Sequence, residues 1–114
     1  MSVRTIASSL PLGNFVTGTY TGDGAATQAI VGVGFQPRFL IVFKNVTTTL
    51  GDMGMKSEVD GNNTKLFWLP TAAWYYQVDH IISLDANGFT VGDGTGSANS
   101  FNINLMSYTY IAYG

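Results

Sequence analysis

The sequence predicts an all-β domain, a single-domain antiparallel β-sandwich or jelly-roll-like fold of roughly eight to ten short strands. Two observations lead to this prediction. Apolar and polar residues alternate with a period of two in many short segments, and Gly, Asn and Asp turns separate these segments. Helix-forming residues are sparse: Glu occurs once in 114 residues, and no long window shows the 3.6-residue apolar period of an amphipathic helix.

The first half of the chain predicts strands at 14–21, 27–31 and 38–44, with Gly22-Asp-Gly24 turning the chain between the first two. The third segment is apolar throughout between Arg38 and Lys44, which predicts a central strand covered on both faces. We expect one buried face to carry Phe39, Ile41 and Phe43, and the other, also covered, to carry Leu40 and Val42.

The second half predicts a hairpin of 53–58 and 64–69 around the turn Asp60-Gly-Asn-Asn63. We expect an irregular aromatic segment at 70–76, a strand at 80–85, a turn at 86–88 and a return strand at 89–91. The chain then closes with 101–105 and 107–113, interpreted as one long strand with a bend near Met106. Gly22, Gly24 and Gly88 are predicted to occupy turn positions with positive φ.

Composition indicates one domain over residues 1–114, with 1–13 as a candidate N-terminal arm. Hydrophobic residues make up 46% of the chain, but charged residues only 11%, against about 25% in an ordinary soluble domain. This shortage of charge suggests that copies of the chain or a larger assembly cover part of the surface. The chain has no cysteine, which excludes a disulfide scaffold and a thiol nucleophile.

The distribution of charge and of apolar residues argues against two classes of partner. The five basic residues are scattered, whereas binding to a phosphate backbone needs a concentrated basic face, so we expect no nucleic acid. The longest apolar run, Phe39–Phe43, is far shorter than a membrane span, and no secretory signal precedes it. We therefore expect a protein that is made soluble and does not bind a membrane.

The search for catalytic residues predicts no enzyme, no cofactor and no metal site. Most of the seven carboxylates lie in turns, where Asp is favoured because it bonds nearby backbone amides. Asp52, Glu58 and Asp60 could approach one another as a glycosidase pair would, but we interpret them as solvated turn residues. His80 is the one histidine and is interpreted as a structural or surface residue, since Asp79 points to the opposite strand face and is no obvious partner for catalysis.

Aromatic residues are the most distinctive feature. Phe67, Trp68, Trp74, Tyr75 and Tyr76 fall within ten residues, and Tyr108, Tyr110 and Tyr113 crowd the last strand. Trp74 to Tyr76 are consecutive and cannot all point inward from a strand. We predict an interface formed by Trp68, Trp74, Tyr75 and Tyr76, while packing in the core or at a sheet edge, and a ligand platform, remain alternatives.

Several phrases resemble a pattern that recurs in tailed-phage virion proteins, roughly G-x-Y-x-G-[ND]-G, x-x-I, then G-F-x-P followed by apolar residues and Lys. The C-terminal half resembles the same proteins, and the likeness covers about two thirds of the chain, with 46–80 unmatched. The matching segments are Gly18–Gly24, Gln28–Ile30, Gly34–Lys44, Asp85–Gly92, Ile103–Asn104 and Tyr108–Tyr113. The G-F-x-P strand and the aromatic close also resemble H-type lectin domains, which are trimeric sugar-binding sandwiches.

The resemblance implies a virion surface protein, made in the host cytoplasm, whose partners are its own copies (as a dimer or trimer) and other virion proteins. A chain that begins at Met1, without a coiled coil or collagen-like stalk, favours a capsid decoration protein over a fibre tip. The alternative is a tail-fibre or receptor-binding module that recognises host glycan. A small glycan hydrolase is a third hypothesis.

Overall fold

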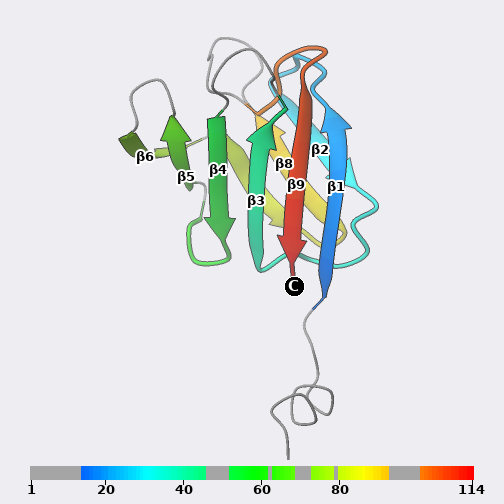
Figure 1. Cartoon of the computed structure of the whole chain (residues 1–114). Helices are drawn as coiled ribbons and strands as arrows, with labels where there is room; N and C mark the ends of the chain where they lie inside the picture. The colour runs from blue at the N-terminus through cyan, green and yellow to red at the C-terminus, as the bar shows by residue number, and fades with distance from the viewer. Residues whose placement is uncertain (1–13, 46–51, 62, 69–72, 79, 93–100) are drawn as a thin grey trace, which may run out of the picture.

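The structure, a computed structural model, describes residues 14–45, 52–61, 63–68, 73–78, 80–92 and 101–114. Within these ranges nine strands form two antiparallel sheets, and the described segments contain no helix (Figure 1). The predicted all-β antiparallel sandwich is therefore confirmed. In the part of the chain described here, no helix has the length and apolar character that a membrane span requires. The predicted arm 1–13 lies outside the described residues.

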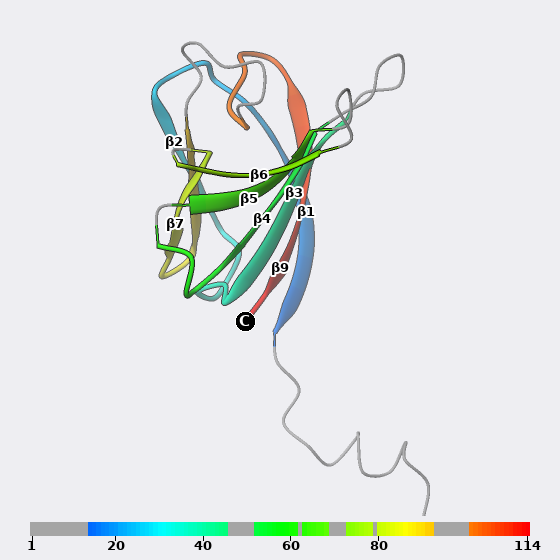
Figure 2. The same cartoon turned by 90° about the vertical axis from the view of Figure 1, so that its left-hand side faces the viewer.

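The larger sheet has six strands, and every neighbouring pair is antiparallel. In spatial order they are β1 (Phe15–Thr21), β9 (Ser107–Tyr113), β3 (Phe39–Lys44), β4 (Asp52–Ser57), β5 (Asn63–Trp68) and β6 (Ala73–Val78). Neighbouring strands in a sheet are typically rotated by about 20–25°, so five steps accumulate about 100°. This twist explains why β5 and β6 run across the direction of β1 and β9 in Figure 2.

The smaller sheet has three strands and lies over one face of the larger sheet (Figure 2). In spatial order it contains β2 (Thr27–Val31), β8 (Gly88–Gly92) and β7 (Ile81–Asp85). The turn at Ala86 and Asn87 joins β7 to β8 as a hairpin, as the sequence predicts. Thr64 of β5 connects the two sheets, because its hydroxyl oxygen accepts a 2.8 Å hydrogen bond from the backbone N–H of Ile81.

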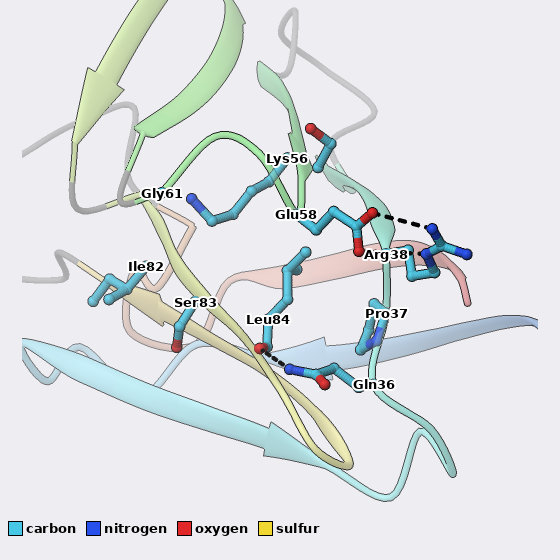
Figure 3. A pocket seen from close by; sticks show the side chains of 10 residues that line it. Gln36, Pro37, Arg38, Lys56, Glu58, Gly61, Ile82, Ser83 and Leu84 are labelled. Carbon is cyan, nitrogen blue, oxygen red and sulfur yellow. Dashed lines mark hydrogen bonds and ion pairs between the residues drawn. The ribbon is translucent and has the colours of Figure 1, made fainter.

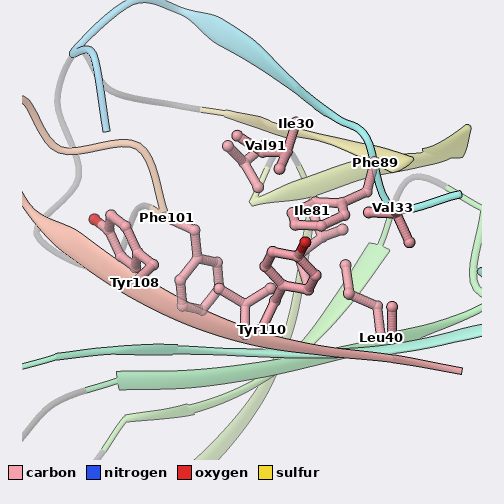
Figure 4. Packing of buried hydrophobic residues seen from close by; sticks show 11 residues of the cluster. Ile30, Val33, Leu40, Ile81, Phe89, Val91, Phe101, Tyr108 and Tyr110 are labelled. Atoms are coloured by element: carbon pink, nitrogen blue, oxygen red, sulfur yellow. The ribbon is translucent and has the colours of Figure 1, made fainter. Parts of the chain in front are cut away.

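The hydrophobic core fills the space between the sheets (Figure 4). Strands β3, β8 and β9 contribute alternate residues, because successive side chains of a strand point to opposite faces. The core residues are Ile30, Val33, Leu40, Val42, Ile81, Phe89, Val91, Phe101, Tyr108, Tyr110 and Ala112. Aromatic rings span the layers, as in the edge-to-face pair of Phe89 and Tyr110, whose ring centroids are 5.1 Å apart.

The expectation for the two faces of β3 was wrong in one respect. Leu40 and Val42 are fully buried, but Phe39 is 37% exposed, and Ile41 and Phe43 are only partly buried. The three-stranded sheet covers the face of β3 that carries Leu40 and Val42. No described segment forms a layer over the opposite face. In β3, therefore, apolar residues on both faces of the strand do not mean that both faces are buried.

Two predicted segments need correction. Residues 70–76 were expected to be irregular, but Ala73–Val78 forms strand β6, which pairs with β5 over its whole length. Residues 101–105 were expected to be a strand, but they form a turn-containing link in which Met106 N–H bonds to the Ile103 carbonyl. Leu105 has a φ of 64°, a left-handed value that no strand accommodates.

The glycine prediction was correct only for Gly24, whose φ is 75°. Gly22 and Gly88 do not have positive φ. They are needed because the backbone passes too close for a side chain. A Cβ at Gly22 would lie 2.1 Å from the Ile103 carbonyl oxygen, and one at Gly88 would lie 1.8 Å from the carbonyl oxygen of Ile30.

Candidate interaction surface

The six-stranded sheet presents a face that points away from the three-stranded sheet, and we call it the outer face. The strand register aligns its residues in rows across the sheet. One row contains Thr17, Ile111, Ile41, Met55, Lys65 and Tyr76. A second row places Phe43 beside Met53, with Trp74 at its far end on β6, and a third places Phe39 between Tyr113 and Ser57. Apolar side chains therefore extend from one edge of the sheet to the other.

Large apolar side chains of this face are open to solvent. Trp74 is 54% exposed and Tyr76 is 57% exposed, at the β6 edge. At the opposite edge, Phe15 and Tyr113 are each more than half exposed, and their rings pack edge-to-face with centroids 6.0 Å apart. Scattered exposed apolar residues are ordinary on a monomer, but a continuous face of them marks an interaction site.

A groove lies at the β6 end of the outer face, and we call it the aromatic groove. It has a volume of about 420 Å³ and is lined by Met55, Lys65, Trp74, Tyr75 and Tyr76. The Lys65 ammonium lies 5.6 Å from the centre of the Tyr76 ring, close enough for a cation–π attraction. The rings of β6, together with Met55 of β4 and Lys65 of β5, therefore form a largely apolar recess that could accept a side chain or a ring of a partner.

Asp60, in the turn between β4 and β5, fixes the polar ends of this groove. Its Oδ1 accepts hydrogen bonds from the Lys65 ammonium at 2.6 Å and from the Tyr76 hydroxyl at 3.0 Å. Its Oδ2 accepts bonds from the backbone N–H and the hydroxyl of Ser57. Lys65 and Tyr76 are thus held in place, and the charge of Lys65 is compensated by a buried carboxylate.

The four predicted interface residues are only partly brought together. Trp74 and Tyr76 share the outer face, two residues apart on β6, and both line the aromatic groove. Tyr75 alternates to the other side of the strand, yet also lines the groove. The backbone of Trp68 lies on β5, paired with Ala73, but its side chain is outside the described residues.

Sequence reasoning missed the residues that extend the surface beyond β6, chiefly Phe15, Phe39 and Tyr113. A signal for them existed. Met53 and Met55 of β4 alternate with the same period of two as the odd-numbered apolar residues of β3. This shared alternation indicates that the sheet has an apolar outer face in addition to its buried face.

The residues considered for catalysis do not form a site in the described part of the chain. His80 is buried, its Nδ1 donates to the Val78 carbonyl oxygen at 2.8 Å, and its ring packs edge-to-face on Phe101. Glu58 pairs with Arg38 at 3.2 Å. Asp79 and the side chain of Asp52 lie outside the described residues. Among the described residues, no three His, Asp or Glu side chains are grouped so that they could hold a metal ion.

Comparison with known proteins gives one result. A search of curated proteins and a search of solved structures both found no match. The family model for DUF7483, described as a domain of unknown function, matches residues 11–114. Because that match spans nearly the whole chain, including every strand of both sheets, the chain belongs to the DUF7483 family.

Proposed function

We propose that this domain is a non-enzymatic structural protein of a tailed-phage virion, a capsid decoration protein that docks on the particle exterior through the outer face of its six-stranded sheet. The observation that carries the proposal is the exposed aromatic face itself. The resemblance of the strand-turn phrases to tailed-phage virion proteins supplies the biological setting.

The chemistry of the outer face suits a protein contact. Lys65 is the one charged residue at its described positions, and Asp60 already compensates that charge. Covering the face therefore removes apolar area from water, at about 25 cal/mol per Å², without stripping water from an unpaired charge. Exposed Trp and Tyr rings are also the side chains that most often dominate binding energy at protein interfaces.

The proposed place in the virion is tested by imaging virions of a phage that encodes this chain. The chain is tagged, and its copies per particle are counted. A decoration protein predicts label over the whole head and hundreds of copies. Label confined to the tail with few copies would contradict the decoration role and favour the fibre role. Absence of the chain from purified virions would overturn both.

One observation favours a second candidate, a receptor-binding module of the tail that recognises host glycan. The aromatic groove combines Trp74 and Tyr76 rings, on which a sugar ring can stack, with the polar ends of Lys65 and Tyr76. Titration with a panel of host-surface oligosaccharides, followed by tryptophan fluorescence, tests it. Saturable quenching that Trp74→Ala removes would support this candidate, and no response across the panel would contradict it.

A further inference from the structure

A second hollow lies between the two sheets, at the end where β3 begins and β4 ends (Figure 3). Its volume is about 480 Å³, within the range of roughly 300–1,000 Å³ that is usual for ligand pockets. Pro37 and Leu84 supply apolar walls, with Ile82 beside Ser83 on the β7 side. Lys56 of β4 crosses the hollow in Figure 3, and its ammonium lies toward Gly61.

Lys56 is unusually buried for a lysine. The residue is 2% exposed, because it occupies an inward-pointing position of β4 opposite Leu40 of β3. Its Nζ donates one hydrogen bond, at 2.7 Å, to the carbonyl oxygen of Asn63. An ammonium carries three N–H donors, so within the described residues two of them have no assigned acceptor.

The charges around Lys56 do not balance. Lys56 and Lys65 approach a single carboxylate, Asp60, whose oxygens already accept bonds from Lys65, Tyr76 and Ser57. The Glu58 carboxylate is turned to the Arg38 guanidinium, with both of its oxygens within 3.3 Å of guanidinium nitrogens. No described carboxylate therefore forms an ion pair with Lys56. Burial lowers the pKa of Lys56, and the nearby Asp60 charge offsets part of that effect.

We propose that this hollow is a binding site for a carboxylate carried on a short apolar stem. The carboxylate oxygens accept the remaining Nζ hydrogens of Lys56, which supplies the missing counter-charge, and the stem packs against Pro37, Ile82 and Leu84. Two sources share this chemistry: a free organic acid, or a glutamate side chain of a neighbouring protein. The site is distinct from the outer face and does not depend on the proposed virion role.

The test is thermal unfolding of the full chain with hexanoate, at an ionic strength kept constant with sodium chloride. Ligand bound to the folded state raises Tm, by about 5–10 °C at ten times Kd for a domain of this size. Hexanamide keeps the stem but lacks the charge, so we expect no shift from it. A second arm uses the capped tripeptide Ala-Glu-Ala. Tighter binding of hexanoate indicates a small acid as the natural ligand, and tighter binding of the peptide indicates a protein side chain.

Lys56→Met keeps an unbranched apolar stem of the same length as the lysine stem up to Cε and removes the ammonium, so it should abolish the hexanoate shift. Lys44→Met removes a lysine outside the hollow and should leave the shift intact. Equal shifts in the Lys56→Met variant and the unmodified protein, or no shift of the unmodified protein with either ligand, would overturn the proposal. If Lys56→Met does not fold, NMR of the unmodified protein tests the site instead. Added hexanoate should change the chemical shifts of the Lys56 Cε–Hε groups and of the Gly61 amide. Unchanged chemical shifts at both positions would refute the site.

Discussion

Asp60 shows how single residues hold this small fold together. Burial by itself would raise the pKa of its carboxyl, but hydrogen bonds from Lys65, from Ser57 and from the Tyr76 hydroxyl outweigh burial and lower the pKa to about 2. The folded state therefore binds the proton of Asp60 more weakly than the unfolded chain does, whose Asp pKa is about 3.9. Asp60 stabilises the fold above that value, and the contribution is lost as pH falls through about 2.

The first prediction concerns this acid sensitivity. Lowering the pKa of Asp60 from about 3.9 to about 2 corresponds to about 2.5 kcal/mol of unfolding free energy at neutral pH. Asp60→Asn should be less stable than the unmodified protein at pH 6, and the difference should shrink as pH falls from 4 toward 2. Urea denaturation at a series of pH values measures this. A stability difference that stays constant down to pH 2 would show that the carboxylate charge is unimportant.

The second prediction compares two reasons for a glycine: a close backbone contact, as at Gly88, and a positive φ, as at Gly61. Gly88→Ala would place a Cβ 1.8 Å from the Ile30 carbonyl oxygen, in backbone that cannot move without breaking the β2–β8 pairing. We expect a loss of more than about 4 kcal/mol, enough to unfold a domain of ordinary stability. Gly61→Ala meets no neighbour but has a φ of 60°, and should cost only about 1 kcal/mol. Denaturant midpoints that place Gly61→Ala as the more damaging change would contradict this account.

These glycines also mark the limit of sequence reasoning at this scale. Gly24 was identified correctly because a Gly-Asp-Gly turn needs positive φ, which is a local property. Gly22 is required by its contact with Ile103, which is far away in sequence. No local pattern contains that information.

At the scale of elements, strand β3 shows that a hydrophobic side chain is not necessarily a buried one. Leu40 is fully buried between the sheets, whereas Phe39, its larger neighbour, lies on the outer face and is partly exposed. The third prediction follows: Leu40→Ala should cost about 2–5 kcal/mol, and Phe39→Ala less than about 1.5 kcal/mol despite removing more atoms. Thermal or urea unfolding of the two variants measures both values. A greater loss from Phe39→Ala would mean that a layer covers the outer face in the isolated chain.

Most strands could be predicted, because alternation and turn residues are local signals. The prediction of 27–31 matches β2, and the 53–58 and 64–69 hairpin corresponds to β4 and β5 within one residue at each end. Strand β6 was missed because Trp74, Tyr75 and Tyr76 are all large and apolar, so no alternation distinguishes their faces. An edge strand without a buried face does not show the alternation of apolar and polar residues by which a strand is recognised.

The pairing of the strands could not be read from the sequence. β1 pairs with β9 across most of the chain length, and the division into six and three strands decides which face of β3 is covered. These are non-local contacts, which is why the aromatic residues at 74–76 were found as a candidate site but Phe15 and Tyr113, which extend it to the opposite edge, were not.

For the whole molecule, the outer face should act in binding rather than in stability. The fourth prediction is that Trp74→Ala and Tyr76→Ala each weaken binding to particles that lack the native protein by about 2 kcal/mol or more. We expect little change in Tm from Trp74→Ala, and a lower Tm from Tyr76→Ala because it also removes the hydrogen bond to Asp60. Val31→Ala removes an apolar side chain of the opposite sheet that is more exposed than either ring, and it should leave binding unchanged. Tyr76→Phe separates the ring from its hydrogen bond to Asp60. Stable Trp74→Ala and Tyr76→Ala variants that bind normally would exclude the aromatic groove as the contact.

Hydroxyl-radical footprinting of the chain, free and assembled on its native particle, tests most directly whether the outer face is the contact surface. We predict that oxidation of Met55, Trp74 and Tyr113 falls strongly on assembly. Leu105, which is exposed in the link before β9, should remain reactive. Unchanged oxidation of Met55, Trp74 and Tyr113 in the assembled particle, with protection at Leu105 instead, would contradict the account.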